Sequence, residues 1–543
     1  MTVFALLFVV FAGLFTWLAM LFLSLTKPVP TEGGVYTEGI VGEPMRINPI
    51  LVQATDVDAD MVQLVYSSLF SYDDAGKIRP SLAEGYELLE DGKKYVVKLH
   101  SGVKWHDGQD VTADDVLFTF RTIQDASYRS PLRANWQGVE VSKGDDDLTV
   151  VFTLKKAYFD FLENLTVGIV PKHIWDGISP EKFSLADANL NPVGSGPFRV
   201  EGFKKDSNGT ILSYELRAFP QYFEGVPFLQ KVVLYFYGSE EDALSAYRRR
   251  EILAVSNVTP ESFPSDIREQ KDTVVHDIAQ PRVFAVFLNE KKNAALAEEP
   301  IRRAFALATD REALVRDVLG GHGEVAYSLF SPAAGAYSAA GEASSFNPDE
   351  AVRVLEDAGW TLGDDGVREK DGVHLEFDIA TPNWDELVKT AHMIENEWNA
   401  IGAHITVTVL ENVSDAQRTI RSRDYSALLY GLATTFEPDP YSFWHSSQTG
   451  ELEHNFALFS DKRADELLSN AREELDADAR SGMYREFQEI LAARMPAVFL
   501  YSPRYVYIQR KSVQGFSAQA INTPASRFQD VAHWYMSTKR VKK

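Results

Sequence analysis

The sequence contains no cysteine in its 543 residues. Disulfide bonds, thiolate metal sites and a thiol nucleophile are therefore excluded. The absence also fits an oxidising compartment outside the cytoplasm, where a stray thiol is a hazard. Hydrophobic residues make up 45% of the chain and aromatic residues 12%. This composition argues against disorder, and the length predicts more than one packed domain.

Basic residues are few relative to acidic ones. The chain has 54 Lys and Arg residues and 78 Asp and Glu residues, which gives a formal net charge of −24. Such a surface repels nucleic acid and anionic lipid, so we expect no nucleic-acid partner. The last five residues, 539–543, are an exception because four of them are Lys or Arg. We expect this basic segment to be a solvated, frayed tail.

Motifs for catalysis or metal binding are missing. The His residues are scattered without His-x-x-x-His spacing, and His106-Asp107-Gly108 is typical of a hairpin turn. Gly194-Ser195-Gly196 lacks the spacing of a nucleophile elbow and predicts a tight turn before a strand. The glycine-rich residues 320–323 lack the Lys-Ser/Thr of a phosphate-binding loop and predict a helix end. We therefore expect no enzymatic activity, no metal and no cofactor.

One long stretch carries no charge. Residues 2–26 contain no Asp, Glu, Lys or Arg and are rich in Phe, Leu, Val and Ala. A helix of about 20 apolar residues crosses the hydrocarbon core of a bilayer. We predict a single-pass transmembrane anchor over residues 1–26, followed by a Pro/Gly linker at 27–34. A cleaved signal peptide is the alternative, although no basic residue precedes the run and no small-x-small site follows it.

The rest of the chain alternates strand and helix patterns, which indicates the α/β class. Apolar runs predict buried strands at residues 232–236 and 284–288, and a longer strand at 498–508. Residues 300–319 predict a helix in two pieces that breaks near Thr309. Further helices are expected at residues 347–358, 391–401, 461–475 and 479–494.

The most informative stretch is residues 79–120. Residues 90–93, Glu-Asp-Gly-Lys, have the composition of a turn. Tyr95, Val97 and Leu99 then alternate with Val96, Lys98 and His100, which predicts a strand with one buried face. Thr112 stands three residues before Asp115 and ahead of an apolar run, which predicts a capped helix start. The unit is therefore a hairpin, a turn and a helix, with no residues arranged for chemistry.

Taken as one string, residues 79–120 resemble the solute-binding proteins that serve ABC importers of peptides, the dipeptide- and oligopeptide-binding family (family 5). The shared features are Ala-Glu after Pro-x-Leu, the Asp-Gly-Lys turn, and His-Asp-Gly followed by Thr-Ala-Asp-Asp-Val. Further matching segments lie at residues 46–49, 65–70, 191–198, 301–319, 347–360 and 439–443. The resemblance covers roughly residues 35–535.

The resemblance implies a two-lobed, periplasmic-binding-protein-like α/β fold of the large class, here preceded by the transmembrane helix. Lobe I would comprise residues 35–70, 191–280 and 506–543. The extra subdomain of lobe I would hold residues 71–190, and lobe II residues 281–505. Two segments would cross between the lobes.

The resemblance also implies a function. Such a protein captures a small peptide or a similar solute between its lobes by hinge closure and delivers it to ABC permease subunits in the membrane. We expect a monomer whose body lies outside the cytoplasm, in the periplasm or at the cell exterior. The alternatives are a binding protein for a sugar, an opine or a metal chelate, or a membrane-tethered sensor with the same fold.

The best candidate for a ligand-binding segment is residues 434–444, which follow a predicted strand and contain two prolines. It carries Phe436, Glu437, Asp439 and Phe443. Peptide-binding relatives usually have an aspartate at the position of Phe436, which pairs with the ammonium group of the ligand. Glu437 could replace it one residue later. Asp439 and Glu437 could instead only satisfy the backbone of the turn.

Two other segments are candidates for the cleft. Trp384 lies in a strand-to-helix loop, where α/β proteins place ligands, and could either stack on the ligand or pack on its own lobe. Met45 and Asn48 lie in the early segment that borders the cleft in relatives. The alternative for Asn48 is a simple turn. No residue of these segments is an expected metal ligand.

Overall fold

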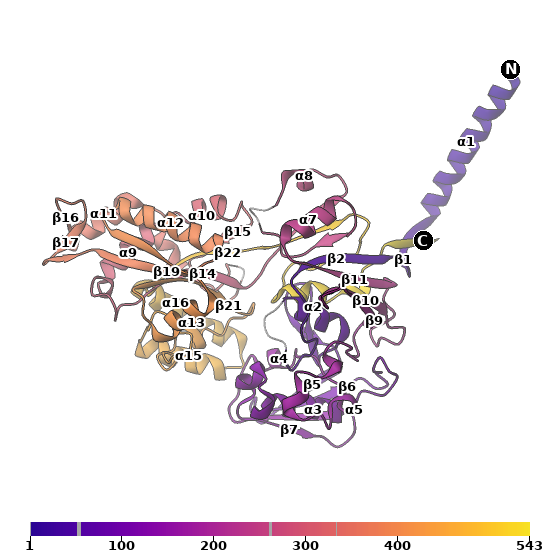
Figure 1. The fold of residues 1–543 in the computed structure, drawn as a ribbon, viewed down its shortest axis with the longest axis horizontal. Coiled ribbons are helices and arrows are strands. Elements are labelled where there is room, and N and C mark those ends of the chain that lie inside the picture. The colour runs from indigo at the N-terminus through magenta and orange to yellow at the C-terminus, as the bar shows by residue number, and fades with distance from the viewer. Residues whose placement is uncertain (1, 52–55, 260–262, 333) are drawn as a thin grey trace.

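Two large sheets organise the chain into two bodies that lie side by side in Figure 1. The computed structural model describes residues 2–51, 56–259, 263–332 and 334–543. We use lobe I for the body built on a seven-stranded sheet and lobe II for the body built on a six-stranded sheet. The two-lobed α/β part of the predicted fold class is thus confirmed.

Lobe I has a mixed sheet in the order β13-β23-β12-β2-β11-β10-β9. Its strands are β2 (Val35–Val41), β9 (Phe198–Lys205), β10 (Ile211–Ala218), β11 (Lys231–Tyr237), β12 (Ala254–Val255), β13 (Thr273–Ile278) and β23 (Tyr505–Arg510). Helices α2 (Asp56–Val65), α7 (Glu240–Arg248) and α8 (Ser265–Arg268) belong to the same body. Parallel pairing joins β2 to β11 and β12, while the outer strands are antiparallel.

A four-stranded antiparallel sheet, β5-β6-β8-β7, lies next to lobe I (Figure 1). It consists of β5 (Ala83–Leu89), β6 (Lys94–Leu99), β7 (Val139–Lys143) and β8 (Thr149–Leu154), with α3 (Ala113–Gln124). The predicted hairpin is confirmed, since β5 pairs with β6 and Tyr95, Val97 and Leu99 are buried. The predicted helix start is also confirmed, because the Thr112 N–H donates to Asp115 Oδ2 at 2.9 Å.

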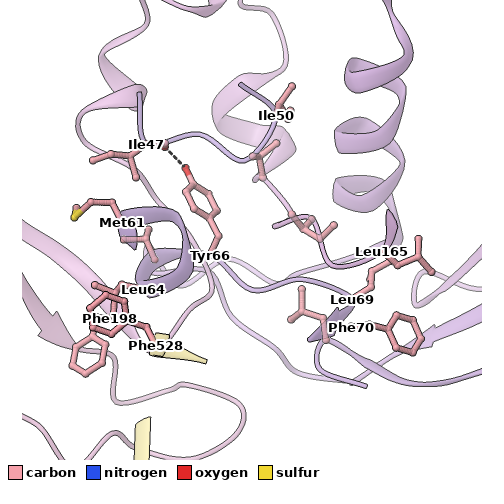
Figure 2. Close-up of a cluster of buried hydrophobic side chains, with 14 of the residues drawn as sticks. Ile47, Ile50, Met61, Leu64, Tyr66, Leu69, Phe70, Leu165, Phe198 and Phe528 are labelled. Atoms are coloured by element: carbon pink, nitrogen blue, oxygen red, sulfur yellow. Dashed lines mark hydrogen bonds between the residues drawn. The ribbon is translucent and has the colours of Figure 1, made fainter. Parts of the chain in front are cut away.

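The four-stranded sheet and lobe I share one hydrophobic core. Figure 2 shows part of it, where Met61 and Leu64 of α2 lie near Phe198 and Phe528, and Leu165 lies near Leu69. The Tyr66 hydroxyl points at the Ile47 carbonyl oxygen, 3.4 Å away. The short elements around this core are β3 (Phe70–Tyr72), β4 (Ile78–Pro80), α4 (Phe161–Asn164), α5 (Lys172–Trp175) and α6 (Pro180–Phe183). A shared core couples the two units mechanically, so they move as one body.

Lobe II has a sheet in the order β15-β22-β14-β21-β19-β20. Its strands are β14 (Arg282–Leu288), β15 (Gly323–Val325), β19 (Glu376–Pro382), β20 (His404–Leu410), β21 (Ala427–Ala433) and β22 (Ala497–Pro503). Helices cover both faces: α9 (Glu299–Ala308), α10 (Arg311–Asp317), α11 (Pro348–Asp357) and α12 (Asp385–Ala400) on one, and α13 (Val413–Ser422), α14 (Tyr441–Trp444), α15 (Lys462–Glu473) and α16 (Ala477–Arg494) on the other. A small sheet of β16 (Thr361–Leu362), β17 (Arg368–Lys370) and β18 (Val373–His374) lies at its far end.

The helix predictions for lobe II hold with small differences. The predicted two-piece helix is confirmed as α9 and α10. The N-cap residue of α10 is Asp310, whose side chain accepts a hydrogen bond from the Ala313 N–H at 2.9 Å. Helix α12 begins at Asp385, several residues before the predicted start, because acidic residues in its first turn suit the positive end of the helix dipole.

The chain crosses between the lobes at two adjacent places. Strand β13 ends at Ile278 and β14 begins at Arg282, while β22 ends at Pro503 and β23 begins at Tyr505. The single strand predicted over residues 498–508 is therefore two strands in different sheets. Arg504 holds the break, since its N–H donates to the His322 carbonyl at 3.0 Å and its guanidinium to the Asp277 carbonyl at 3.3 Å.

Two sequence motifs that looked separate meet in lobe I. The Gly194 N–H donates to His106 Nδ1 at 3.2 Å, and His106 Nε2 donates to the Gly196 carbonyl at 3.0 Å. Nδ1 must accept a hydrogen bond here, so the ring is neutral. The predicted turns are confirmed, and the histidine holds one turn against the other rather than serving chemistry.

Lobe I also buries a charged triad. The Arg527 guanidinium donates to Glu38 Oε1 at 2.7 Å and to both Asp60 carboxylate oxygens at 2.6 Å. All three side chains are at most 1% exposed. Removing one member would leave an unpaired buried charge, which is strongly unfavourable. The triad therefore links β2, α2 and the C-terminal segment rigidly.

The N-terminal helix α1 (Thr2–Leu25) projects away from lobe I (Figure 1). Within the part of the chain that the structure describes, however, no helix combines the length and apolarity that a membrane crossing requires. The prediction of an N-terminal transmembrane anchor is therefore wrong. It rested on a run of residues that carries no charge and is rich in Phe, Leu, Val and Ala, a pattern that is necessary for a membrane span but not sufficient.

The C-terminal segment is not a frayed tail, contrary to expectation. It forms β24 (Ser537–Lys542), which pairs antiparallel with β1 (Thr26–Thr31). Arg540 donates from Nη2 to the carbonyls of Leu23 and Thr26, at 3.2 and 2.8 Å. The basic side chain thus satisfies carbonyl groups at the end of α1, where cations are favoured.

Gly194 is a position where a side chain cannot be accommodated. A Cβ there would lie 1.9 Å from the Val65 carbonyl oxygen, whereas a Cβ on Gly202 of β9 would meet nothing within 4 Å. We expect Gly194→Ala to lower the free energy of unfolding by more than about 2 kcal/mol, because backbone must shift. Gly202→Ala is the matched control and should change it by less than about 1 kcal/mol. Urea denaturation measures both, and equal effects would contradict this packing.

Acid should destabilise lobe I through His106. Burial lowers the pKa of His106 to about 4, below its usual value near 6.5. The folded state therefore binds fewer protons than the unfolded state, and stability falls as the pH drops from about 6.5 to about 4. The loss attributable to this residue is about 3 kcal/mol. Urea denaturation across this range should give a shallower pH dependence for His106→Gln; an unchanged slope would contradict it.

Candidate functional site at the junction of the lobes

The segment after β21 begins at the crossing between the lobes. The Thr434 N–H donates to the Pro281 carbonyl at 2.8 Å, and the Thr434 hydroxyl donates to the same oxygen at 3.2 Å. These bonds attach the predicted ligand-binding loop to the crossing segment. Side chains of this ligand-binding loop line two cavities.

The first cavity lies at the crossing, and we call it the hinge cavity. Its volume is about 190 Å³. The crossing contributes Gln280 and Pro503, and lobe II contributes the apolar walls. Phe436 and Pro438 of the loop close one side.

Phe436 also reaches the other lobe. A Cβ placed on Gly76 of lobe I would lie 2.5 Å from the Phe436 ring. Gly76 has φ +80°, a backbone conformation that favours glycine. The ring of Phe436 therefore packs on a bare backbone surface of lobe I. The contact between the lobes at Phe436 is therefore apolar, at a position where the resemblance implied an aspartate in peptide-binding proteins.

The second cavity is larger and polar, and we call it the junction cavity. Its volume is about 590 Å³. The subdomain of lobe I supplies Lys156, Tyr158 and Glu163, while lobe II supplies Asp439 and Arg472. A cavity of this size with walls from two bodies is typical of a ligand site.

Asp439 is held by partners from both lobes. Arg472 Nε donates to Asp439 Oδ2 at 2.6 Å, and the Tyr158 hydroxyl donates to the same oxygen at 3.4 Å. The Tyr441 N–H donates to Asp439 Oδ1 at 3.1 Å. The Arg472 guanidinium lies over the rings of Tyr441 and Tyr158, 4.4 and 5.1 Å from their centres. The aspartate therefore joins the lobes and also satisfies the turn backbone, as the alternative predicted.

Phe159 extends from the subdomain of lobe I into lobe II. Its N–H donates to the Arg472 carbonyl at 3.1 Å, and its ring packs on the core of lobe II. The Arg480 guanidinium lies 4.2 Å from the ring centre. Nearby, Lys156 Nζ pairs with Glu473 Oε1 at 2.5 Å. These contacts hold the two lobes together at the side away from the crossing.

Carboxylates gather at this junction. Burial, together with the nearby carboxylates of Glu163, Asp439 and Glu437, raises the pKa of Asp160 to about 8, while Arg480 acts in the opposite direction. The Asp160 side chain makes no hydrogen bond or ion pair within the described residues. Glu437 is 73% exposed and has one long contact, 3.4 Å from Arg480 Nη2. A cationic group placed here would relieve the repulsion among the carboxylates.

The remaining candidates lie elsewhere. Trp384 caps α12 and is 55% exposed, and Met45 is 60% exposed. Asn48 is fully buried, where it accepts from the Ile50 N–H at 2.9 Å and donates to Asn189 Oδ1 at 3.2 Å. Phe443 packs on the core of lobe II. None of these four lines the hinge cavity or the junction cavity as described.

Sequence reasoning missed Arg472, Lys156 and the segment of Tyr158, Phe159 and Asp160. The run Tyr158-Phe159-Asp160-Phe161 was a signal, because it places three aromatic residues and one acidic residue side by side in the sequence. Arg472 gave no such signal in the sequence, because it lies on the polar face of a long helix, as many solvent-exposed arginines do.

Comparison with known proteins assigns the architecture. Residues 77–452, more than half of the chain, match the family described as bacterial extracellular solute-binding proteins, family 5 Middle. The chain belongs to this family. The match confirms the resemblance carried by the sequence motifs, and it places the protein among solute-binding proteins that act outside the cytoplasm.

Relatives share nearly the whole chain. The oligopeptide-binding protein AppA of Bacillus subtilis (strain 168) is 28% identical over 516 residues, which are 94% of this chain and 92% of that protein. The structure of B. subtilis AppA in complex with a nonapeptide has a TM-score of 0.72 at 26% identity, and covers 94% of this chain and 100% of that chain. The ABC transporter substrate-binding protein CtaP of Listeria monocytogenes has a TM-score of 0.80 at 25% identity, with 93% and 100% covered.

The contact made by Phe159 should favour the closed arrangement. Phe159→Ala removes a half-buried ring from lobe II and should cost the closed form about 1 kcal/mol, a several-fold shift toward open molecules. Small-angle X-ray scattering should then give a larger radius of gyration. Phe346→Ala, which removes an exposed ring of lobe II, is the control. Identical scattering from the two variants would count against this role.

Proposed function

We propose that the chain is the extracytoplasmic substrate-binding component of an ABC importer and captures peptides between its two lobes by hinge closure. The observation that carries this proposal is the junction cavity, whose walls come from residues 134–164 next to lobe I and from lobe II, in a molecule whose lobes are joined by a double crossing of the chain. A ligand that touches both walls binds the closed form better and shifts the population toward it. ABC permease subunits would receive the solute from the closed form.

Peptides are favoured as ligands by the relatives and by the chemistry of the junction. B. subtilis AppA, which matches 94% of this chain in sequence and in structure, has a structure in complex with a nonapeptide. The polar junction cavity offers carboxylates near Asp160 for an ammonium group, and cations at Lys156 and Arg472. A zwitterionic, extended ligand suits such mixed charges.

One observation favours a different solute. The resemblance implies an aspartate for the ligand ammonium group at the position of Phe436, whose ring packs on Gly76. A sugar, an opine or a metal chelate would not need that aspartate. A sensor with the same fold is a further alternative. The division into lobe I (35–70, 191–280, 506–543), subdomain (71–190) and lobe II (281–505) is part of this proposal.

Thermal unfolding of the purified chain with peptide, sugar and opine libraries tests the ligand class. A peptide present at 100 times its dissociation constant should stabilise the fold by about 2.7 kcal/mol and raise Tm. Small-angle scattering should show compaction with the same peptides. Stabilisation by sugars or opines alone would contradict the peptide assignment.

Matched peptides with free and acetylated amino termini test the ammonium site. We expect Glu437→Gln or Asp160→Asn to weaken free peptides about tenfold or more, because a charge-assisted bond is lost, and to leave acetylated peptides unchanged. Isothermal titration calorimetry measures both. Glu140→Gln, on an exposed strand position, is the control. Unchanged affinity in a variant would remove its residue from the site.

A further inference from the structure

A buried arginine of lobe II lacks an anionic partner. Arg311, the first residue of α10, is 3% exposed. Burial lowers the pKa of Arg311 to about 10, which still leaves the side chain charged at neutral pH. The residues that the structure describes place no carboxylate within ion-pair distance of its guanidinium. Buried charges in proteins are paired with few exceptions, so a counter-ion is expected here.

Backbone carbonyl groups hold part of the guanidinium. Arg311 Nε donates to the Phe499 carbonyl at 2.7 Å. Nη1 donates to the carbonyls of Ala306 and Ser344 at 3.0 and 3.1 Å, and more weakly to that of Thr309 at 3.4 Å. Nη2 makes no hydrogen bond to any described residue. The carbonyl dipoles orient the group, but they carry no net charge and leave Nη2 for a further acceptor.

Glu397 of α12 is the acidic residue that acts on Arg311 from a distance. Its Oε2 accepts a hydrogen bond from the Asp310 N–H at 3.2 Å rather than from the guanidinium. Burial raises the pKa of Glu397 to about 7, so this carboxyl group is only partly ionised at neutral pH. It therefore compensates the buried positive charge incompletely.

A small cavity lies beside Arg311 inside lobe II, and we call it the arginine cavity. Its volume is about 30 Å³, and Arg311 is part of its lining. About 10–15 Å³ is enough for one water molecule, so the space admits an occupant of one or two heavy atoms. No Asp or Glu belongs to the described residues that line it. The wall thus carries the charge of the arginine alone.

Two more donors of the arginine cavity lack an acceptor. Ser338 Oγ accepts from the Ala340 N–H at 3.3 Å, but its own hydroxyl hydrogen has no acceptor among the described groups. The Tyr327 hydroxyl makes no hydrogen bond within the same residues, and the ring centre lies 4.8 Å from the Arg311 guanidinium carbon. Both residues line the cavity. Three residues therefore offer unused donors to one small space.

Acceptors in the wall are already occupied. Gln488 Oε1 accepts from the Ser328 hydroxyl at 2.7 Å and from the Ser338 N–H at 3.2 Å. The Ser344 hydroxyl donates to the Gly341 carbonyl at 2.7 Å. A buried water molecule needs two to four polar partners and must place its own hydrogens on acceptors. An occupant that only accepts hydrogen bonds fits this wall better than water does.

We infer that the arginine cavity binds a small monovalent anion of the halide class, with Arg311, Ser338 and Tyr327 as its donors. The site lies within lobe II and does not depend on the proposed function. An anion there neutralises the buried charge and joins the segment 327–344 to α10 and α16, which line the same space. Its binding therefore stabilises the folded state of lobe II.

Thermal unfolding of the full chain tests the site with halide salts. Tm is measured over a series of sodium chloride or sodium bromide concentrations, with sodium gluconate keeping the ionic strength constant. Gluconate is too large for the cavity. Either halide should raise Tm by about 2 °C along a saturating curve, because a ligand that binds only the folded state stabilises it. Equal Tm values in halide and gluconate would overturn the inference.

Variants of the wall locate the effect. Ala492→Leu fills the cavity from α16 and leaves Arg311 in place, so it should abolish the halide dependence of Tm. Ser338→Ala removes one donor and should raise the half-saturating halide concentration about threefold or more; it serves if the first variant does not fold. Ala400→Leu, the same change as the first at an exposed helix position, is the control and should keep the halide dependence. Full halide dependence in both wall variants would overturn the site.

Crystals of the full chain grown in sodium bromide give a direct view. Anomalous scattering should place a bromide ion between Arg311, Tyr327 and Ser338. A water molecule at that position, with no anomalous signal, would overturn the inference. A bromide peak without any halide dependence of Tm would indicate binding at crystal concentration only, and would overturn it as well.

Discussion

The two adjacent crossings of the chain between its sheets are the constraint on which the rest of the molecule depends. Strand β13 pairs with β23 in lobe I, and β14 pairs with β22 in lobe II, so both connections leave and enter at neighbouring strands. Few residues lie between these strands, and Arg504 is tied to backbone on both sides. A rotation about such a short double connection displaces residues near the crossing only a little and displaces residues far from the crossing much more.

This geometry gives the two cavities different roles. The hinge cavity adjoins the crossing, so its walls are largely set before any closure. The junction cavity is an open pocket lined by residues 134–164 and by lobe II, and Lys156 in its wall pairs with Glu473 of lobe II. Under the proposed function, ligand binding would bring together the walls of the junction cavity. The buried triad of Arg527, Glu38 and Asp60 keeps lobe I rigid enough to transmit that closure.

Local patterns predicted much of the fold. The hairpin of β5 and β6, the capped start of α3 and the break between α9 and α10 depend on residues close together in the chain, and their spacing was sufficient. Predictions failed where the outcome depended on distant partners. The basic C-terminus pairs with β1, and the expected long strand at 498–508 divides at Arg504, because each half completes a different sheet.

The candidate site also combines features that the sequence predicted with features that only the tertiary structure determined. The sequence by itself determined that residues 434–440 form a loop with aromatic and acidic side chains, that no cysteine chemistry is available, and that the chain is α/β. Only the tertiary structure decided that Asp439 pairs with Arg472, that Phe436 packs on Gly76, and that Phe159 enters lobe II. Turn and helix preferences act between neighbours along the chain, whereas these contacts join residues brought together only when the lobes fold and close.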